Sequence, residues 1–266
     1  ALRILTLAGN LGRGKGNAND LTWQETQINA GHEASLQSGN DTKLEGSVVT
    51  APKVSAEVGG HLTVTSLQDT STYRNEQQSA GGSVTFGPKV TGSVNLSASH
   101  VKSDYASVNQ QAAIRAGDEG FNVEVKGNTT LNGSAITSTD KAVANNANHF
   151  HTGGQLSTTD ITNQAHYSAS ASGVNIGVGT SPLGKYVPSG TSAGVGSDSG
   201  KSSSITRAGI SGIAGDTNAR TDSSNKEVSV ALAKIFDANK VQKEINAQVA
   251  ITQSFTYEAE IGRAHV

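Results

Sequence analysis

The stretch Lys43-Leu-Glu-Gly-Ser-Val-Val-Thr50 decides the fold class, because it returns as Thr130-Leu-Asn-Gly-Ser-Ala-Ile-Thr137. A second motif repeats with it. Gly59-Gly-His-Leu62 returns as Gly153-Gly-Gln-Leu156, and each copy is followed by an apolar residue five positions later and a tyrosine six beyond that. Repeats of small and β-forming residues, separated by Gly, Asn and Asp, are typical of stacked coils in a solenoid. We therefore expect a protein that works through shape, length and surface.

The spacing within each repeat predicts the size of one coil. Leu44 and Leu62 are 18 residues apart, and Leu131 and Leu156 are 25 apart. The excess of seven residues predicts a loop inserted around 141–151. A spacing of about 20 residues suits one coil of a parallel β-helix, with Gly and Asn at corners that need positive φ. The side chains expected to point inward are Leu44, Val49, Leu62, Val64, Leu131, Ile136 and Leu156.

The composition limits both the fold and the function. Only 34% of the 266 residues are hydrophobic and 4% are aromatic, with 31 glycines. A coil needs only a few inward aliphatic side chains, so a solenoid tolerates such a composition better than a globular core does. The net charge of −2 comes without a basic stripe, so we expect no nucleic-acid partner. No run of apolar residues is long enough for a transmembrane helix, and no signal-peptide pattern opens the chain.

Two residue types are absent from the chain. Without cysteine there are no disulfides, no thiol catalysis and no cysteine-ligated zinc. Without methionine the chain lacks an initiating residue, so we expect an internal piece of a longer protein. The tail Glu260-Ile-Gly-Arg-Ala-His-Val266 matches the translation of a sequencing-library adapter, and we interpret 260–266 as an artefact rather than as an ordinary polar tail.

Composition also predicts the organisation along the chain. Residues 83–99 alternate polar and apolar side chains, which fits either a hairpin with one exposed face or strands of the coil core. The Gly/Ser-rich stretch after residue 180 is typical of a flexible linker. The five predicted segments are an N-terminal strand and Gly/Asn-rich lead-in (1–26), a β-helix (27–180), a linker (181–223), a helical junction (224–257) and the adapter tail (260–266).

Two short amphipathic helices are predicted in the junction. Ser224-Asn-Lys-Glu227 forms a capping box ahead of Val228, Leu232, Ile235 and Phe236. Asp237 or Asn239 is expected to cap a second helix that carries Val241, Ile245 and Val249, with Phe255 near its end. Helices of this length are marginal in isolation, so we expect them to dock on the end of the β-helix, on each other or on a following domain.

The best candidate for a metal site is the pair His149 and His151, whose imidazoles would lie on one side of a strand. Their nearest further ligands in sequence are Asp160 and His166. A solvated loop explains the pair equally well, and we predict no metal site. Gly194–Ser202 resembles a phosphate-binding loop but has Val195 where the motif needs glycine, and Gly12–Gly16 is a lone glycine cluster. Neither predicts a nucleotide site.

The remaining polar motifs also carry no predicted chemistry. Glycoside hydrolysis on a β-helix needs carboxylates clustered on neighbouring coils, and we find no acidic cluster that recurs at coil spacing. Asp69 and Asp118-Glu119 are read as turn residues. The asparagines of four N-x-[ST] sequons are expected to stack at turns rather than to carry glycans. These residues are Asn40, Asn95, Asn128 and Asn132.

Several blocks together resemble the haemagglutinin repeats of large bacterial exoproteins secreted by the two-partner route. The closest likeness is to the contact-dependent growth-inhibition and filamentous-haemagglutinin families, just upstream of their pre-toxin region, and it covers about residues 30–255. The blocks are 59–83, Ser103-Asp-Tyr-Ala-Ser107, Ala116-Gly-Asp-Glu-Gly-Phe121, Lys126-Gly-Asn-Thr129, Tyr167-Ser-Ala-Ser-Ala-Ser172, Gly209-Ile-Ser-Gly-Ile-Ala-Gly-Asp216 and 240–249.

This resemblance implies a right-handed parallel β-helix with extra hairpin strands and a short C-terminal helical segment. It implies secretion to the bacterial cell surface through an outer-membrane transporter, and engagement of the target cell's outer membrane or a receptor there. It supplies no catalytic residue, cofactor or small-molecule substrate, because catalysis in that family belongs to a downstream toxin. We therefore expect a non-catalytic stalk segment that presents and helps deliver a C-terminal toxin. The alternatives are a filamentous adhesin without a toxin and a β-helical polysaccharide lyase or hydrolase.

Overall fold

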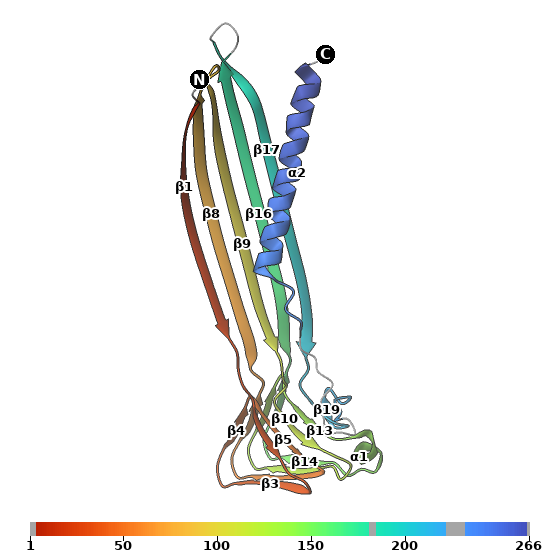
Figure 1. Cartoon of the computed structure of the whole chain (residues 1–266). Helices are drawn as coiled ribbons and strands as arrows, with labels where there is room; N and C mark the ends of the chain where they lie inside the picture. Colours follow the sequence, from red (N-terminus) through yellow and green to blue (C-terminus); the bar gives the residue numbers. More distant parts are fainter. Residues whose placement is uncertain (1–3, 181–184, 222–231, 265–266) are drawn as a thin grey trace.

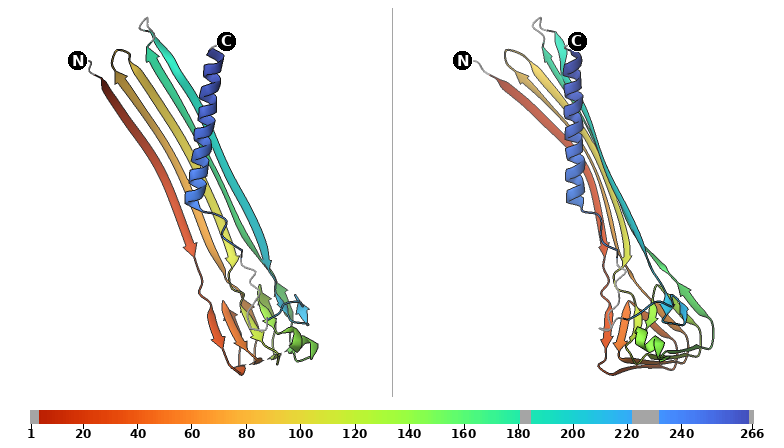
Figure 2. Two further views of the ribbon diagram at one scale, coloured as in Figure 1. Left: turned by 45° about the vertical axis from the view of Figure 1, so that its right-hand side comes forward. Right: turned by 90° about the vertical axis from the view of Figure 1, so that its right-hand side faces the viewer.

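The computed structural model describes residues 4–180, 185–221 and 232–264, and it is mostly β with a C-terminal helix, as the sequence predicts. The chain builds two parts (Figures 1 and 2). One is a base of short strands, which we call the coil base. The other is a sheet of five very long strands that rises from it, which we call the hairpin sheet.

The coil base consists of three sheets, and all their pairings are parallel except for one at an edge. The chain visits the three sheets in turn. The first sheet contains β2 (Thr26–Asn29), β5 (Ser47–Ala51), β10 (Ala113–Ala116), β13 (Ala135–Thr137), β18 (Gly209–Ile210) and β19 (Ala214–Gly215). The second contains β3 (Glu33–Ser38), β6 (Lys53–Val58), β11 (Phe121–Val125) and β14 (His149–Thr152). The third contains β4 (Thr42–Glu45), β7 (Leu62–Thr65), β12 (Thr129–Asn132) and β15 (Leu156–Thr159).

The spacing of about 20 residues and the inward side chains that the sequence predicts are found in these parallel sheets. Thr42 of β4 pairs with Leu62 of β7, 20 residues further along the chain. In the same sheet Leu44, Val64 and Leu131 lie side by side in register, although a hairpin separates the last two in sequence. Val49, Leu62, Val64, Leu131 and Ile136 are at most 1% exposed, and Leu44 and Leu156 pack half-buried against this core. Burial of each fully enclosed side chain stabilises the fold by about 1.5–3 kcal/mol.

The Gly-Gly motif marks a corner where successive coils touch. The N–H of Gly60 donates to the carbonyl of Asn40, Gly127 donates to Gly60, and Gly154 donates to Gly127. A Cβ on Gly59 would lie 2.3 Å from the carbonyl oxygen of Gly39. Glycine is therefore required by the close approach of the neighbouring backbone.

The seven extra residues of the second repeat form the predicted insertion. In the first repeat only Pro52 separates β5 from β6, whereas β13 and β14 are joined by residues 138–148. This loop contains the short helix α1 (Asp140–Ala144), whose N-terminal N–H groups are capped by the Thr139 side chain.

The hairpin sheet is antiparallel, with strand order β1-β8-β9-β16-β17. Each long hairpin leaves the coil base after two coils and returns to it. Two coils advance the base by about 10 Å, which is also the width of the two strands that one hairpin adds to the sheet. The coil base and the hairpin sheet therefore lengthen by the same distance for each hairpin. The strands are β1 (Leu5–Leu21), β8 (Gln68–Phe86), β9 (Thr91–Val108), β16 (Ile161–Thr180) and β17 (Tyr186–Thr206).

Two predicted segments need correction. The linker prediction for 181–223 is wrong over residues 186–206, which form β17. The predicted N-terminal strand is present as β1, and it continues through the Gly/Asn-rich stretch to Leu21. Much of 27–180 lies in the hairpin sheet rather than in coils. Glycine and serine form strands here because the ladder satisfies their backbone and a helix packs closely on β17.

The C-terminal helix α2 (Ala238–Ala264) lies along the hairpin sheet (Figure 2). Asp237 caps it as predicted, since its carboxylate accepts from the N–H of Lys240 at 2.9 Å. Val241 and Ile245 are buried against Val101 of β9 and alanines of β16, so the helix docks on the hairpin sheet rather than on the end of the β-helix or on a second helix. The capping box at 224–227 lies outside the described residues, and 232–237 form no helix.

Candidate functional site

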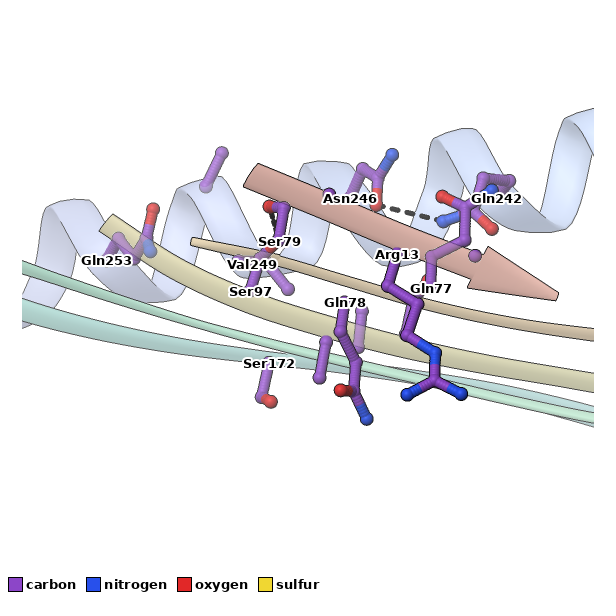
Figure 3. A pocket seen from close by; sticks show the side chains of 16 residues that line it. Arg13, Gln77, Gln78, Ser79, Ser97, Ser172, Gln242, Asn246, Val249 and Gln253 are labelled. Carbon is purple, nitrogen blue, oxygen red and sulfur yellow. Dashed lines mark hydrogen bonds between the residues drawn. The ribbon is translucent and has the colours of Figure 1, made fainter. Parts of the chain in front are cut away.

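The hairpin sheet has two chemically different faces. Successive side chains of a strand point to opposite sides, so the cross-strand register assigns each residue to a face. Tyr73, Val101 and Ala169 face α2. On each of these strands the residues directly before and after them, and every second residue from there, project from the opposite face. We call this opposite face the outer face. Figure 3 shows this division, with Ser79 and Ser97 on the α2 side and Gln78 and Ser172 on the other.

The outer face is apolar over the half of the sheet far from the coil base. Leu11, Ala80, Leu96 and Val174 lie in one row across four strands, and Leu7 pairs with Val84 in another. From Leu5 to Leu11 this surface extends about 20 Å along β1. Its large exposed side chains are Leu5, Leu7, Leu11, Val84, Phe86, Val94, Leu96, Ile176 and Val195, with exposed fractions between 39% and 77%.

The exposure of this surface decides between the two interpretations of residues 83–99, which were a hairpin with one exposed face and strands of the coil core. Val94 is 47% exposed and Leu96 is 48% exposed, so they belong to an exposed face and not to the coil core. Contiguous apolar patches of this kind are rare on soluble monomers and mark interaction surfaces. The outer apolar face is therefore the strongest candidate for a functional site among the described residues.

A belt of charged residues follows on the same face, nearer the coil base. Arg74 and Asp104 form an ion pair at 2.5 Å, and His166 lies 3.0 Å from the same carboxylate. By register the belt holds five basic side chains and two acidic ones, together with His100 and His166. The charged members are Arg13, Lys15, Arg74, Lys102, Lys201, Glu76 and Asp104. The belt is therefore cationic and borders the apolar surface.

The opposite face is polar and partly covered by α2. Serine and threonine hydroxyls pair across its strands, for example Ser79 with Ser97 at 2.7 Å. A cleft of 580 Å³ lies between α2 and this face (Figure 3). Among the described residues that line it, Arg13 is the only ionisable one. The serine hydroxyls that line the cleft therefore have no acid or base beside them in its lining to activate them as nucleophiles.

The structure does not assemble a metal centre from the predicted histidines. His149 and His151 do lie on the same exposed side of β14, as their spacing predicts. His149 is instead 3.0 Å from Glu124, while His166 lies in the charged belt and Asp160 accepts from the N–H of Ala208. The described residues contain no group of three or more possible ligands.

One pair of neighbouring carboxylates was not predicted from the sequence. Glu57 of β6 and Glu124 of β11 are register partners on neighbouring coils, which are separated in sequence by a whole hairpin. Each carboxylate has its own partner, because Gln37 donates to Glu57 at 3.1 Å and His149 contacts Glu124. Both line a hollow of 880 Å³ together with Lys126 and His151, and neither carboxylate is buried, so this pair does not provide the enclosed acid and base of a glycosidase.

The other polar motifs have structural roles. The glycine cluster at 12–16 lies in β1, and the stretch 194–202 lies in β17, so neither forms a phosphate-binding loop. Asn128 stacks at a corner as predicted, and its side chain accepts from the N–H of Gln155 at 2.9 Å. Asp69 lies at the start of β8 rather than in a turn.

Comparison with known proteins defines the class. The Hemagglutinin repeat family matches residues 3–80. The chain is 37% identical over 267 aligned residues to "Toxin CdiA" of Escherichia coli, covering 92% of this chain and 8% of that protein. It is 33% identical to "tRNA nuclease CdiA" of Escherichia coli strain NC101, with coverage of 96% and 8%. It is 43% identical to "Deoxyribonuclease CdiA" of Dickeya dadantii, with coverage of 64% and 5%.

The chain is thus a haemagglutinin-repeat segment of an exoprotein. More particularly, it belongs to the haemagglutinin-repeat region of the CdiA proteins of contact-dependent growth inhibition. It spans 8% of the length of the two Escherichia coli relatives and 5% of that of the Dickeya dadantii protein. No solved structure matches it. Within the described residues, no helix has both the length and the apolar character needed to cross a membrane.

Proposed function

We propose that this chain is a non-catalytic stalk segment of a large secreted exoprotein, which presents and helps deliver a C-terminal toxin to neighbouring bacteria. The coil base acts as the rod, and we interpret it as a right-handed parallel β-helix. The toxin and nuclease names of the relatives support this role, because each relative extends far beyond the matched segment. In this proposal the protein leaves its own cell through a two-partner outer-membrane transporter.

The hairpin sheet contacts the outer membrane of the target cell. The observation that carries this step is the outer apolar face, which is continuous across the far half of the sheet and bordered by the cationic belt. Apolar side chains gain free energy by leaving water for the acyl region, at about 25 cal/mol per Å² of apolar area. The basic side chains of the belt then lie at the level of anionic headgroups.

A vesicle-flotation experiment tests this contact. The 266-residue chain is mixed with vesicles of phosphatidylglycerol and phosphatidylcholine, and the bound fraction is measured. Leu96→Asp places a charge on the apolar face and is expected to reduce the bound fraction at least tenfold. Asn95→Asp is the matched control, because Asn95 is exposed at the same height on the opposite face. Equal binding by both variants would exclude the outer face as the contact surface.

A second experiment tests toxin delivery separately. Leu96→Asp and Asn95→Asp are introduced into the full-length exoprotein, and growth inhibition of neighbouring cells is measured together with surface display. We expect only Leu96→Asp to lower inhibition while display stays normal. If vesicle binding falls and inhibition does not, the membrane contact is real but does not serve delivery. An adhesin without a toxin would give attachment to cells with no inhibition by either protein.

A further inference from the structure

A hollow of 490 Å³ lies on the outer face, where the apolar surface meets the charged belt. Its side chains come from two neighbouring rows that cross strands β1, β8, β9 and β16. We call them the apolar row and, nearer the coil base, the polar row. The apolar row consists of Leu11, Ala80, Leu96 and Val174, and the polar row consists of Arg13, Gln78, Ala98 and Ser172. The hollow is therefore apolar at one end and polar at the other.

The hollow exists because two alanines are diagonal neighbours on adjacent strands. Ala80 of β8 belongs to the apolar row and Ala98 of β9 to the polar row, and both strands are internal to the sheet. A single methyl group at Ala98 leaves space between Gln78 and Ser172, and the methyl group of Ala80 leaves space beside Leu96. The two spaces join into one hollow that crosses the boundary between the rows.

The polar end presents several hydrogen-bond donors together. Arg13 is the register partner of Gln78, and Figure 3 shows both side chains on the same side of the sheet as Ser172. A guanidinium group binds two phosphate oxygens at once, and an amide N–H and a hydroxyl can donate to the others. Among the described residues none forms an ion pair with Arg13, whereas Arg74 of the belt is paired with Asp104. The charge of Arg13 is therefore available to a ligand.

The surroundings of the polar end favour an anion. Neither the apolar row nor the polar row contains an acidic residue. The nearest carboxylate by register is Glu76 in the next row toward the coil base, and its register partner is Lys15. Arg13 and Lys15 follow each other on the outer face of β1, so two positive charges lie beside the hollow.

The length of the hollow matches the boundary of a membrane. Successive rows on one face of a sheet are about 7 Å apart along the strand. The polar headgroup layer on each side of a bilayer is about 5–8 Å thick. When the apolar row reaches the acyl region, Arg13 therefore lies in the headgroup layer. A lipid fills both ends of such a hollow, whereas a soluble phosphate ester leaves the apolar end to water.

We propose that this hollow binds one anionic lipid through its phosphate group. Arg13 is the main partner of the phosphate, Gln78 and Ser172 donate to its remaining oxygens, and the acyl chain lies over Ala80 toward Leu96. The inference rests on the proposed membrane contact and names the class of ligand that the contact surface selects. A free phosphate ester lacks the acyl chain, and a zwitterionic lipid carries a positive group beside its phosphate, so both should bind more weakly.

An NMR titration tests the site directly. The probe is dihexanoylphosphatidylglycerol, kept below the concentration at which it forms micelles. We expect the Nε–H of Arg13, the side-chain amide of Gln78 and the methyl groups of Ala80 and Ala98 to shift together and to saturate. Glycerol phosphate and dihexanoylphosphatidylcholine should bind at least tenfold more weakly. Equal binding of glycerol phosphate would make the ligand a soluble phosphate ester, and equal binding of the phosphatidylcholine would show that the negative charge is not recognised. Either result overturns the proposal.

Substitutions separate a discrete site from diffuse charge attraction. Arg13→Gln should weaken binding of the short-chain lipid at least tenfold. Lys201→Gln removes the same charge from the belt outside the hollow and should change the affinity less than twofold. An equal loss in both variants would assign binding to the belt as a whole. Ala98→Leu fills the floor of the hollow and should weaken binding although it enlarges the apolar surface. Unchanged affinity in Ala98→Leu would place the lipid elsewhere.

Vesicle flotation distinguishes a failure of this site from a failure of the membrane contact. If the short-chain lipid does not bind but Leu96→Asp still reduces flotation, the membrane contact stands and the discrete lipid site falls. If the parent chain does not float with vesicles but the titration saturates and depends on Arg13, the lipid site stands and the broad contact by the outer face falls.

Discussion

Asp69 and Asn163 occupy the same position in the two repeats, and each accepts a hydrogen bond from the backbone N–H where a returning strand meets the coil base. The N–H of Trp23 donates to Asp69 at 2.7 Å, and that of Val108 donates to Asn163 at 2.9 Å. Both side chains are buried, with exposed fractions of 5% and 0%. The same hydrogen bond therefore forms at both junctions, where β1 and β9 return to the coil base, and it ties the hairpin sheet to the coils.

Removal of the hydrogen bond between Val108 and Asn163 should destabilise the protein. The Asn163 side chain also donates to Thr206 at 2.9 Å, and Asn163→Ala leaves the N–H of Val108 buried without an acceptor. We expect the free energy of unfolding to fall by about 1–3 kcal/mol. Urea unfolding followed by circular dichroism measures it. Asn175→Ala, at an exposed position of the same strand, serves as the control. An equal loss of unfolding free energy in both variants would show that the hydrogen bonds of Asn163 do not stabilise the protein.

The corner glycines offer a second prediction with an internal control. Gly59→Ala brings a methyl group within 2.3 Å of a backbone oxygen of the neighbouring coil, whereas Gly39→Ala points into open space. We expect Gly59→Ala to cost about 1–3 kcal/mol and Gly39→Ala to be neutral or slightly stabilising. Thermal unfolding of the two variants side by side gives the answer. A stable Gly59→Ala variant would mean that adjacent corners separate easily and that the coil stack is loosely held.

The coil core was predictable because its signal is local. Leu62 and Leu131 lie in short β-forming motifs next to Gly or Asn corners, and the repeat of these motifs indicates a coil of about 20 residues. The hairpin sheet was not. Strands such as β17 are composed of Gly and Ser, which also make linkers, and only the contact with α2 explains the glycines at 194 and 196. Tertiary packing decides such cases, and composition cannot show it.

The candidate site, like the fold, was predictable from the sequence only in part. The alternation at Val94 and Leu96 was visible, but which face is solvent-exposed depends on pairing with β16 and on the position of α2, both far away in sequence. The stacking of Glu57 on Glu124 was invisible for the same reason, since an entire hairpin separates them. Long-range register is what the sequence alone could not supply.

A charge inside the coil core gives a third prediction. Leu62 is 1% exposed, so Leu62→Asp buries a carboxylate with no designed partner, and we expect its coil to unfold. Leu11→Asp makes the same chemical change at a side chain that is 77% exposed in the hairpin sheet, and its stability should match that of the parent. Hydrogen exchange localises the loss. Retained protection of β7 in Leu62→Asp would contradict the inward orientation of this side chain.

The carboxyl group of Asp118, which contacts the inserted loop, titrates in a predictable direction. A hydrogen bond from Lys141, together with one from Thr139, lowers the pKa of the Asp118 carboxyl below its usual value. Because the folded-state pKa is the lower one, the contribution of Asp118 to stability is present above the unfolded pKa and is lost as pH falls through the folded pKa. Lys141→Ala should therefore raise the pKa of Asp118 back toward its ordinary range. A carboxyl NMR titration of both proteins measures the shift. Lys243→Ala on α2 is the control, and an unchanged Asp118 pKa in Lys141→Ala would show that the ammonium group does not hold this carboxylate in solution.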